Sequence, residues 1–322
     1  MWEDSVRPNS KNELVGQPTF SKDLESWESL SDAPRAIILS GPSGTGKTSA
    51  AYVIAKTLLG DAYNSHNFTI SNGSDERGID FIRHELKTLM RVKPIDCDRK
   101  IVLIDEADGL TPAAQDAARQ IIENYAENAL VILTVNELEK NRPAIKSRCT
   151  IYNFTPINVD DGARRLWDIL QDVRIEEDVV EGWTPHLKTL VDEMDGDLRG
   201  CINLLESLPK TKNALEDRIV TIQSNEFEDS AQLILDDEFM KMRNNLVKQV
   251  NTGVPLKTIM KKLYYEVNRK FSRQDTDKDK LFDAMVAYGQ IMEKIYEWPM
   301  GDQAFCDYMV ASIRKEVKKT GE

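Results

Sequence analysis

The fold of this chain is decided by the stretch Gly41-Pro42-Ser43-Gly44-Thr45-Gly46-Lys47-Thr48. It matches the pattern G-x-x-x-x-G-K-[ST] in full, and the flanks favour a strand at 36–39 and a helix at 50–59. In that setting glycines let backbone N–H groups approach a polyphosphate, Lys47 adds a positive charge, and Thr48 offers a hydroxyl to Mg²⁺. The stretch predicts a nucleotide-binding loop; a chance glycine-rich turn is the alternative.

Strand and helix patterns alternate up to about residue 155, and helical patterns follow alone. Further strands are predicted at 67–70, 100–104, 129–135 and 150–154, and amphipathic helices at 79–91 and 112–125. This alternation is typical of a parallel sheet covered by helices. Later helices are predicted at 159–171, 185–194, 197–208, 242–250, 256–271, 280–297 and 305–318, with a polar linker at 224–229. We expect three domains: an α/β nucleotide-binding domain at 1–156, a small helical domain at 157–224 and an all-helical domain at 225–322.

Composition narrows the class of protein further. Of 322 residues 41% are hydrophobic, enough for packed cores, yet no apolar run approaches the ~20 residues of a membrane span. The N-terminus lacks a secretion signal, and the four cysteines are too scattered for zinc or a disulfide framework. We expect no membrane partner and a cytoplasmic protein, or a nuclear one in a eukaryote. The net charge of −12 disfavours indiscriminate nucleic-acid binding but allows a local basic track.

Two acidic residues follow the third predicted strand, in Ile101-Val102-Leu103-Ile104-Asp105-Glu106-Ala107-Asp108. Phosphoryl transfer needs a carboxylate at the end of a strand to hold Mg²⁺, which suits Asp105. It also needs a group that orients and polarises the attacking water, which suits Glu106. The alternative, that these acids only cap the next helix, fits Asp108 better than its neighbours.

Three further polar residues are candidates by position. Asn136 follows the fourth strand, where ligands of this kind of sheet are bound, although an asparagine there is often a turn residue. Arg148 precedes the fifth strand and could point out of the subunit as an arginine finger supplied in trans, or be an ordinary surface arginine. Arg199 stands near a predicted helix start, from where it could fold back over the nucleotide.

A basic stripe is predicted on the helix at 79–91. Arg83, Lys87 and Arg91 follow at i, i+4 and i+8, with Arg77 and Lys93 on either side. Such a stripe could bind the phosphates of a nucleic acid in a salt-dependent way. A solvated helix face is the alternative.

Together these motifs resemble those of the clamp-loader ATPases of the AAA+ class, and most of all the small-subunit type of replication factor C. The resemblance covers residues 2 to about 206. It is carried by Trp2-Glu3-Asp4-Ser5-Val6-Arg7-Pro8, Glu13-Leu14-Val15-Gly16-Gln17, Asn72-Gly73-Ser74-Asp75-Glu76-Arg77-Gly78-Ile79-Asp80, Ser147-Arg148-Cys149 and Gly196-Asp197-Leu198-Arg199. It implies an AAA+ ATPase domain, a helical lid and a helical collar, in an ATP- and Mg²⁺-dependent subunit of a pentameric loader. That loader would open a ring-shaped sliding clamp and place it on primer–template DNA.

The resemblance also implies roles for individual residues. Arg148 would be the trans finger, Asn136 and Arg199 the two sensors of the γ-phosphate, and Arg77 and Arg83 part of the segment that tracks DNA, beside Lys87 and Arg91. Thr48 and Asp105 would hold the metal. The nucleotide contacts would come from Val6, Arg7, Pro8, Val15, Gly16, Gly41, Pro42, Ser43, Gly44, Thr45, Gly46, Lys47, Thr48, Ser49, Asn136 and Arg199.

Two other functions fit parts of the pattern. One is a different AAA+ motor that remodels DNA or protein; the triplet at 147–149 and the helical C-terminal third argue against it. The other is a subunit that binds ATP without hydrolysing it. The presence of both Asp105 and Glu106 argues against that hypothesis.

Overall fold

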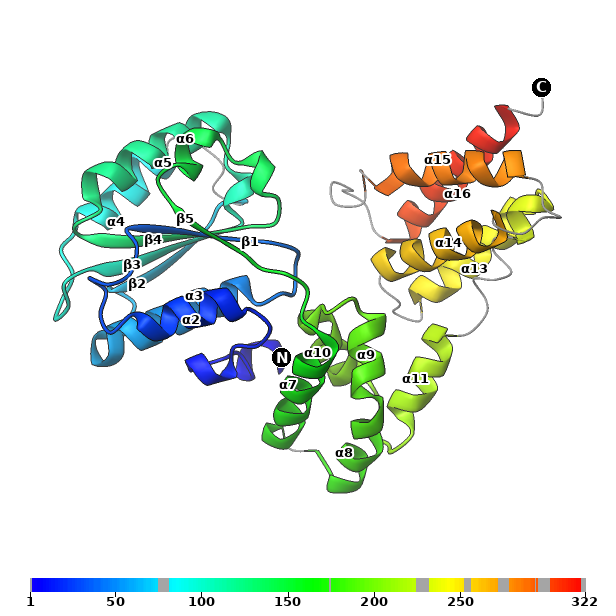
Figure 1. Ribbon diagram of the computed structural model, residues 1–322, viewed down its shortest axis with the longest axis horizontal. Coiled ribbons are helices and arrows are strands. Elements are labelled where there is room, and N and C mark those ends of the chain that lie inside the picture. The colour runs from blue at the N-terminus through cyan, green and yellow to red at the C-terminus, as the bar shows by residue number, and fades with distance from the viewer. Residues whose placement is uncertain are drawn as a thin grey trace. The chain divides into compact units, whose positions relative to one another are not determined.

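The computed structural model describes residues 2–74, 81–173, 175–223, 232–251, 256–271, 278–292, 294 and 302–319. The chain forms two compact units, Met1–Lys210 and Thr211–Glu322 (Figure 1). The three-domain division at 156/157 and 224/225 stays a prediction.

The first unit contains a five-stranded parallel sheet, as the alternating pattern predicts. The strand order is β2-β3-β4-β1-β5. The carboxyl ends of the central strands align, because Leu39 pairs with Thr134 and Asn72 pairs with Asp105. The strands are β1 (Ala36–Ser40), β2 (Phe68–Asn72), β3 (Lys100–Asp105), β4 (Ala129–Val135) and β5 (Thr150–Asn153).

Helices cover both faces of this sheet (Figure 1). Alternate side chains of β1 show the division: Ile37 packs into the core under α2 and α3, and Ile38 into the core under α4, α5 and α6. Because both faces are buried, the strands read as nearly continuous apolar runs rather than as alternating ones. The helices are α2 (Pro18–Ser26), α3 (Lys47–Leu59), α4 (Lys87–Arg91), α5 (Pro112–Tyr125) and α6 (Pro143–Lys146).

The helix predicted at 79–91 differs from the expectation within its described part. The segment η3 (Phe81–Leu86) is π-helical, and only α4 is α-helical. Ile82, Leu86 and Met90 are fully buried against the sheet at intervals of four residues. That interval reports the buried face and not the hydrogen-bond pattern, so the sequence could not reveal the wider turn.

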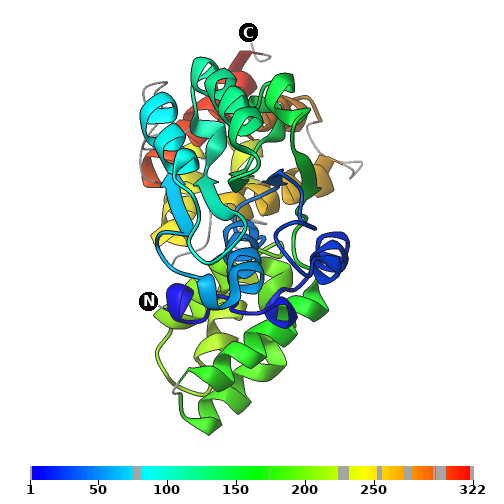
Figure 2. The same cartoon turned by 90° about the vertical axis from the view of Figure 1, so that its left-hand side faces the viewer.

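The remainder of the first unit is helical. Asn158 and Asp197 cap α7 and α10 by accepting from backbone N–H groups, the arrangement favoured at helix starts. The short α1 (Trp2–Ser5) packs against α10, and Figure 2 shows the dark blue N-terminal segment beside the green helices. Periodicity did not predict α8. The helices are α7 (Val159–Asp172), α8 (Glu177–Trp183), α9 (Leu187–Glu193) and α10 (Leu198–Ser207).

The regular elements described in the second unit are all helices. Its core is built where α15 packs on α14 and α16, and α13 packs on α14 and α16. Large apolar side chains such as Leu263, Leu281 and Phe305 are buried there, which stabilises the unit by about 1.5–3 kcal/mol for each side chain. The helices are α11 (Ala214–Gln223), α13 (Phe239–Asn251), α14 (Leu256–Phe271), α15 (Lys278–Met292) and α16 (Asp302–Lys319).

Candidate nucleotide-binding site

A cavity lies beyond the carboxyl ends of the strands, at the loop that joins β1 to α3. Residues 43–49 of that loop and helix start line it. Gly46 caps α3 with φ of 94°, a left-handed conformation that glycine adopts without strain. The first N–H groups of α3 have no partner within the helix, so the helix start can bind an anion.

Lys47 is buried at the first position of α3. Its Nζ donates to the carbonyl oxygens of Gly41 and Pro42, at 2.6 and 2.8 Å, and to Asn136 Oδ1 at 3.0 Å. Burial lowers the pKa of Lys47 from 10.5 to about 8, although the carboxylates of Asp105 and Asp108 oppose this shift. The loop oxygens thus take the place that phosphate oxygens would have.

Asp105 ends β3 beside the hydroxyl of Thr48. Thr48 Oγ1 donates to Asp105 Oδ1 at 3.0 Å, and Thr134 Oγ1 donates to the same oxygen. A hydroxyl and a carboxylate are hard oxygen ligands, and Mg²⁺ binds few of these from a protein beside phosphate oxygens and waters. No group of three His, Cys, Asp or Glu residues suited to a metal ion occurs within the described ranges. The hydroxyl of Thr48 and the carboxylate of Asp105 fit Mg²⁺ by their donor chemistry.

Glu106 has a left-handed backbone, with φ of 53° and ψ of 44°. This is uncommon for a residue with a side chain and is found most often at functional sites. Its N–H donates to Thr134 Oγ1 at 3.0 Å, and its exposed side chain lines the cavity. Asp108 has a separate task, since it accepts from the N–H groups of Asn136 and Glu137, at 3.1 and 3.3 Å. It thereby holds Asn136 at the end of β4, a contact that sequence reasoning missed.

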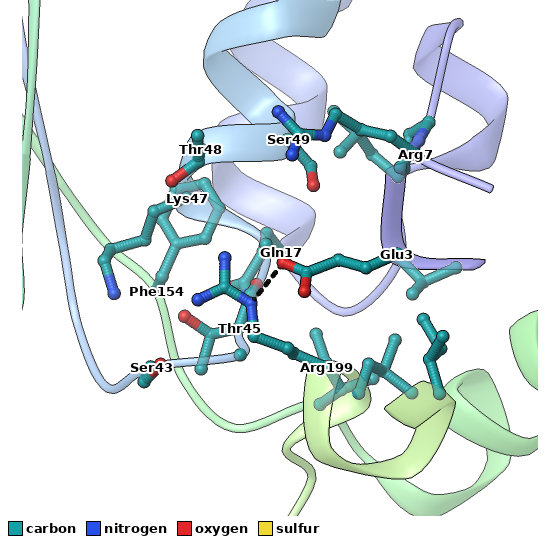
Figure 3. A pocket seen from close by; sticks show the side chains of 18 of the residues that line it. Glu3, Arg7, Gln17, Ser43, Thr45, Lys47, Thr48, Ser49, Phe154 and Arg199 are labelled. Atoms are coloured by element: carbon teal, nitrogen blue, oxygen red, sulfur yellow. Dashed lines mark hydrogen bonds and ion pairs between the residues drawn. The ribbon is translucent and has the colours of Figure 1, made fainter. Parts of the chain in front are cut away.

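Arg199 reaches the cavity from the opposite side, on the first turn of α10. Its Nε lies 2.8 Å from Glu3 Oε1, and both side chains line the cavity (Figure 3). Asp197, the cap of α10, lies directly against the phosphate loop: a Cβ on Gly44 would stand 1.6 Å from Asp197 Oδ1. Glu3 and Asp197 belong to segments that carry the family resemblance, but the residues alone gave no role for their side chains.

Gln17 connects the phosphate loop with the segment that leads to α7. Its Nε2 donates to the carbonyl oxygens of Thr45 and Thr155, at 3.3 and 2.8 Å, and its Oε1 accepts from Thr155 N at 3.2 Å. The side chain is buried, so these hydrogen bonds are costly to lose. Gln17 thus links the position of Thr155 to that of the phosphate loop through hydrogen bonds.

The N-terminal segment forms one end of the cavity. Val6, Arg7, Pro8 and Val15 line it, and their contacts with a nucleotide stay a prediction. A buried arginine on α7, Arg165, fastens this segment: it donates to Val6 O at 2.9 Å and to Glu13 Oε2 at 3.4 Å. Three other residues predicted to contact the nucleotide are not among the lining residues: Gly16, Gly41 and Pro42. Gly16 packs against Ile157.

Arg148 does not line this cavity. It follows α6, its side chain is half exposed, and its Nε is hydrogen-bonded to Glu123 Oε1 of α5. This hydrogen bond from Arg148 lowers the pKa of Glu123. The structure therefore does not bring Arg148 to the chain's own phosphate loop, and its role in trans stays a prediction.

The predicted DNA-contacting residues are described only in part. Lys87 and Arg91 are exposed on α4. Arg77 and the side chain of Arg83 lie outside what the structure describes. The structure thus leaves the four-residue stripe untested.

The fold and the site together define an ATPase of the AAA class. A family model described as ATPase family associated with various cellular activities (AAA) matches residues 37–157. A replication factor C small subunit from Methanothermobacter thermautotrophicus is 30% identical over 302 residues, which cover 92% of each chain. One from Sulfurisphaera tokodaii is 34% identical, covering 83% of this chain and 81% of the relative. The chain belongs to the replication factor C small subunit family.

Solved structures are similar at lower identity. A RuvB mutant from Thermotoga maritima aligns with a TM-score of 0.49 and 17% identity, covering 73% of this chain and 81% of that one. A DNA polymerase III gamma subunit-related protein from the same organism aligns with a TM-score of 0.46 and 15% identity, covering 94% and 99%. Within the described residues, no helix is both long and apolar enough to cross a membrane.

Proposed function

We propose that this chain is an ATP-hydrolysing subunit of a loader that opens a ring-shaped sliding clamp and places it on primer–template DNA. The observation that carries this proposal is the separation of Arg148 from a cavity that otherwise gathers Lys47, Thr48, Asp105, Glu106 and Asn136. A site that gathers these groups but not Arg148 suits an assembly in which a neighbouring subunit supplies the arginine finger. Family membership supports the same conclusion.

The geometry suggests how the chain's residues would act on ATP. Lys47 would exchange its loop carbonyl partners for the β- and γ-phosphate oxygens, and Thr48 and Asp105 would hold Mg²⁺, which neutralises developing charge on those oxygens. Glu106 would accept a proton from the attacking water, and Asn136, held by Asp108, would orient it. Arg148 of the adjacent subunit would stabilise the transferred phosphoryl group.

The basic residues at 77–91 would contact the DNA backbone in this proposal. Arg77, Arg83, Lys87 and Arg91 would neutralise phosphates, so binding would weaken as salt is raised. This local charge would act against the overall net charge of −12.

The test is steady-state ATP hydrolysis by the assembled loader, with and without the clamp and primer–template DNA. We expect stimulation only when both are present, and a loss of about 10³-fold or more in an Arg148→Ala assembly that still binds ATP. Lys146→Ala is the matched control, because Lys146 is a nearby cation at the end of α6 that pairs with the exposed Glu139. Stimulation by DNA without any clamp would favour another AAA+ motor, and absence of hydrolysis would favour a non-hydrolysing subunit.

A further inference from the structure

The ion pair of Glu3 with Arg199 leaves part of the arginine directed at the phosphate loop. Nε of Arg199, the nitrogen nearest the aliphatic part of the side chain, lies 2.8 Å from Glu3 Oε1. Figure 3 shows one nitrogen of Arg199 joined to Glu3, while another points away from Glu3, toward Thr45 of the phosphate loop. The terminal nitrogens of an arginine form the planar fork that binds phosphate oxygens. The pair with Glu3 is therefore compatible with a phosphate contact by Arg199.

We propose that Glu3 is a positioning residue that orients Arg199 toward the γ-phosphate of ATP. The inference rests on the proposed function as an ATP-hydrolysing loader subunit, in which Arg199 would sense the γ-phosphate, as the family resemblance implies. A free arginine loses rotamer freedom when it contacts a ligand, and this loss weakens binding by about two- to tenfold. A side chain already held in the binding orientation by Glu3 avoids that loss.

The backbone that carries Glu3 is fastened to α10. The helix α1 packs against α10, and the ring of Trp2 lies 4.5 Å from Lys210 Nζ, a cation–π contact. Lys210 Nζ in turn donates to the carbonyl oxygens of Leu205 and Glu206, both at 2.9 Å, at the end of α10. The helix that carries Glu3 therefore packs directly on the helix that carries Arg199. These contacts hold the two backbones at a defined separation.

The backbone of Arg199 is fixed as well. Asp197 Oδ1 accepts from Gly200 N at 3.0 Å and closes the first turn of α10. The same carboxylate contacts the phosphate loop at Gly44, where a Cβ would not fit. Both backbones are held in place by these contacts. The ion pair with Glu3 therefore acts on the side-chain torsions of Arg199.

The opposite hypothesis is that Glu3 competes with the nucleotide for Arg199. A competitor would repel phosphate through its charge, so removal of that charge by either Glu3→Ala or Glu3→Gln would tighten ATP binding. A positioning residue acts through its acceptor oxygen. Glutamine keeps this oxygen, and alanine removes it, so the two variants separate the hypotheses.

The experiment measures the affinities of the full chain for ATP and for ADP, each with Mg²⁺, by titration calorimetry. We expect Glu3→Ala to lower the ratio of ATP to ADP affinity about two- to tenfold, because only ATP carries the phosphate that Arg199 would contact. Glu3→Gln should keep the ratio within about twofold of the parent. In an Arg199→Gln background, Glu3→Ala should leave the ratio unchanged.

Glu25→Ala is the matched control, because Glu25 is an exposed glutamate of α2 that does not line the cavity. Its ratio should equal that of the parent. A ratio that is unchanged or raised in Glu3→Ala would overturn the inference while leaving the proposed function standing. A parent chain that binds no ATP would overturn both.

Discussion

Two walls of the nucleotide cavity hold their charged groups by different means. The loop wall comprises residues 43–48 with Asp105, Glu106, Thr134 and Asn136. Its inner groups have partners close by: Lys47 donates to loop carbonyls and Asn136, and Asp105 accepts from two hydroxyls. The lid wall comprises Glu3, Arg165, Asp197 and Arg199. Its arginines are partnered by the N-terminal segment, and the pair of Glu3 with Arg199 remains partly exposed.

We interpret this difference as a division of roles: the loop wall carries out hydrolysis, and the lid wall adapts to the bound ligand. A buried, mutually hydrogen-bonded wall is preorganised, which favours stabilisation of a transition state. Partly exposed ion pairs contribute little to stability, so such pairs can rearrange at small cost when a ligand enters. We therefore expect substitutions in the loop wall to affect the rate of hydrolysis most, and those in the lid wall to affect stability or ligand preference.

The largest effect is expected from Glu106→Gln. Loss of the proton acceptor should lower the turnover number for ATP about 10²- to 10⁴-fold, with ATP affinity almost unchanged, since glutamine keeps the shape of the side chain. Single-turnover hydrolysis and ATP titration of the assembled protein would measure this. The control is Glu137→Gln, an exposed carboxylate after β4 that pairs with Lys140 and does not line the cavity. Equal rates in the Glu106→Gln variant and the parent would contradict our separation of the two walls.

A smaller effect of another kind is expected from Arg165→Met on the lid wall. Methionine keeps most of the volume but leaves Val6 O and Glu13 without this donor, so the free energy of unfolding should fall by about 1.5–3 kcal/mol. Chemical denaturation would measure the change.

The adjacent Arg164→Met is the matched control for that variant. Arg164 is exposed and lies 3.7 Å from Asp161, so its loss should change the free energy of unfolding by less than about 0.5 kcal/mol. Similar values for the two variants would mean that Arg165 does not fasten the N-terminal segment. A large loss of turnover in Arg165→Met, with the free energy of unfolding unchanged, would mean that the lid wall also contributes to hydrolysis.

The loop wall was predictable from sequence because its chemistry is local in the chain. Eight consecutive residues specify the loop, and an apolar strand that ends in Asp105 and Glu106 specifies the carboxylates. The parallel sheet then aligns the carboxyl ends of β1, β3 and β4, and this brings Asn136 to Lys47. The loop motif and the alternation of strands and helices were therefore enough to predict which residues meet at this wall.

The lid wall was only partly predictable. Arg199 stands at a recognisable helix start, but its partner Glu3 and the contact from Arg165 to Val6, 159 residues apart, depend on tertiary packing. Any acidic side chain in the chain is chemically able to pair with an arginine, so composition does not select Glu3. Gln17 presents the same difficulty, since its buried amide donates to Thr45 and also to Thr155, which lies 138 residues further along the chain than Gln17.

The smallest effect we expect is a pH dependence of ATP binding that originates in Lys47. Burial lowers its pKa from 10.5 to about 8 in the free chain, so the ammonium is present at pH 7 and is mostly lost at pH 9. Bound phosphates favour the charged form, and ATP affinity should therefore fall by about fivefold between pH 8 and pH 9, as the charged fraction of free Lys47 does. Titration with ATP across this range would measure the fall.

The lowered pKa of Lys47 also determines how the free energy of unfolding changes with pH. Between pH 8 and 10.5 the unfolded chain binds the proton that folded Lys47 has lost, so the free energy of unfolding of the free chain should gain a contribution that increases with pH in this window. Lys47→Arg stays charged throughout, which should flatten both dependences, whatever its affinity for ATP. If ATP affinity in the parent were constant from pH 7 to 9, Lys47 would not be the buried, desolvated cation of the loop wall. If the variant kept the same fall in ATP affinity, another group would be responsible, and the preorganisation attributed to Lys47 would have to be assigned elsewhere.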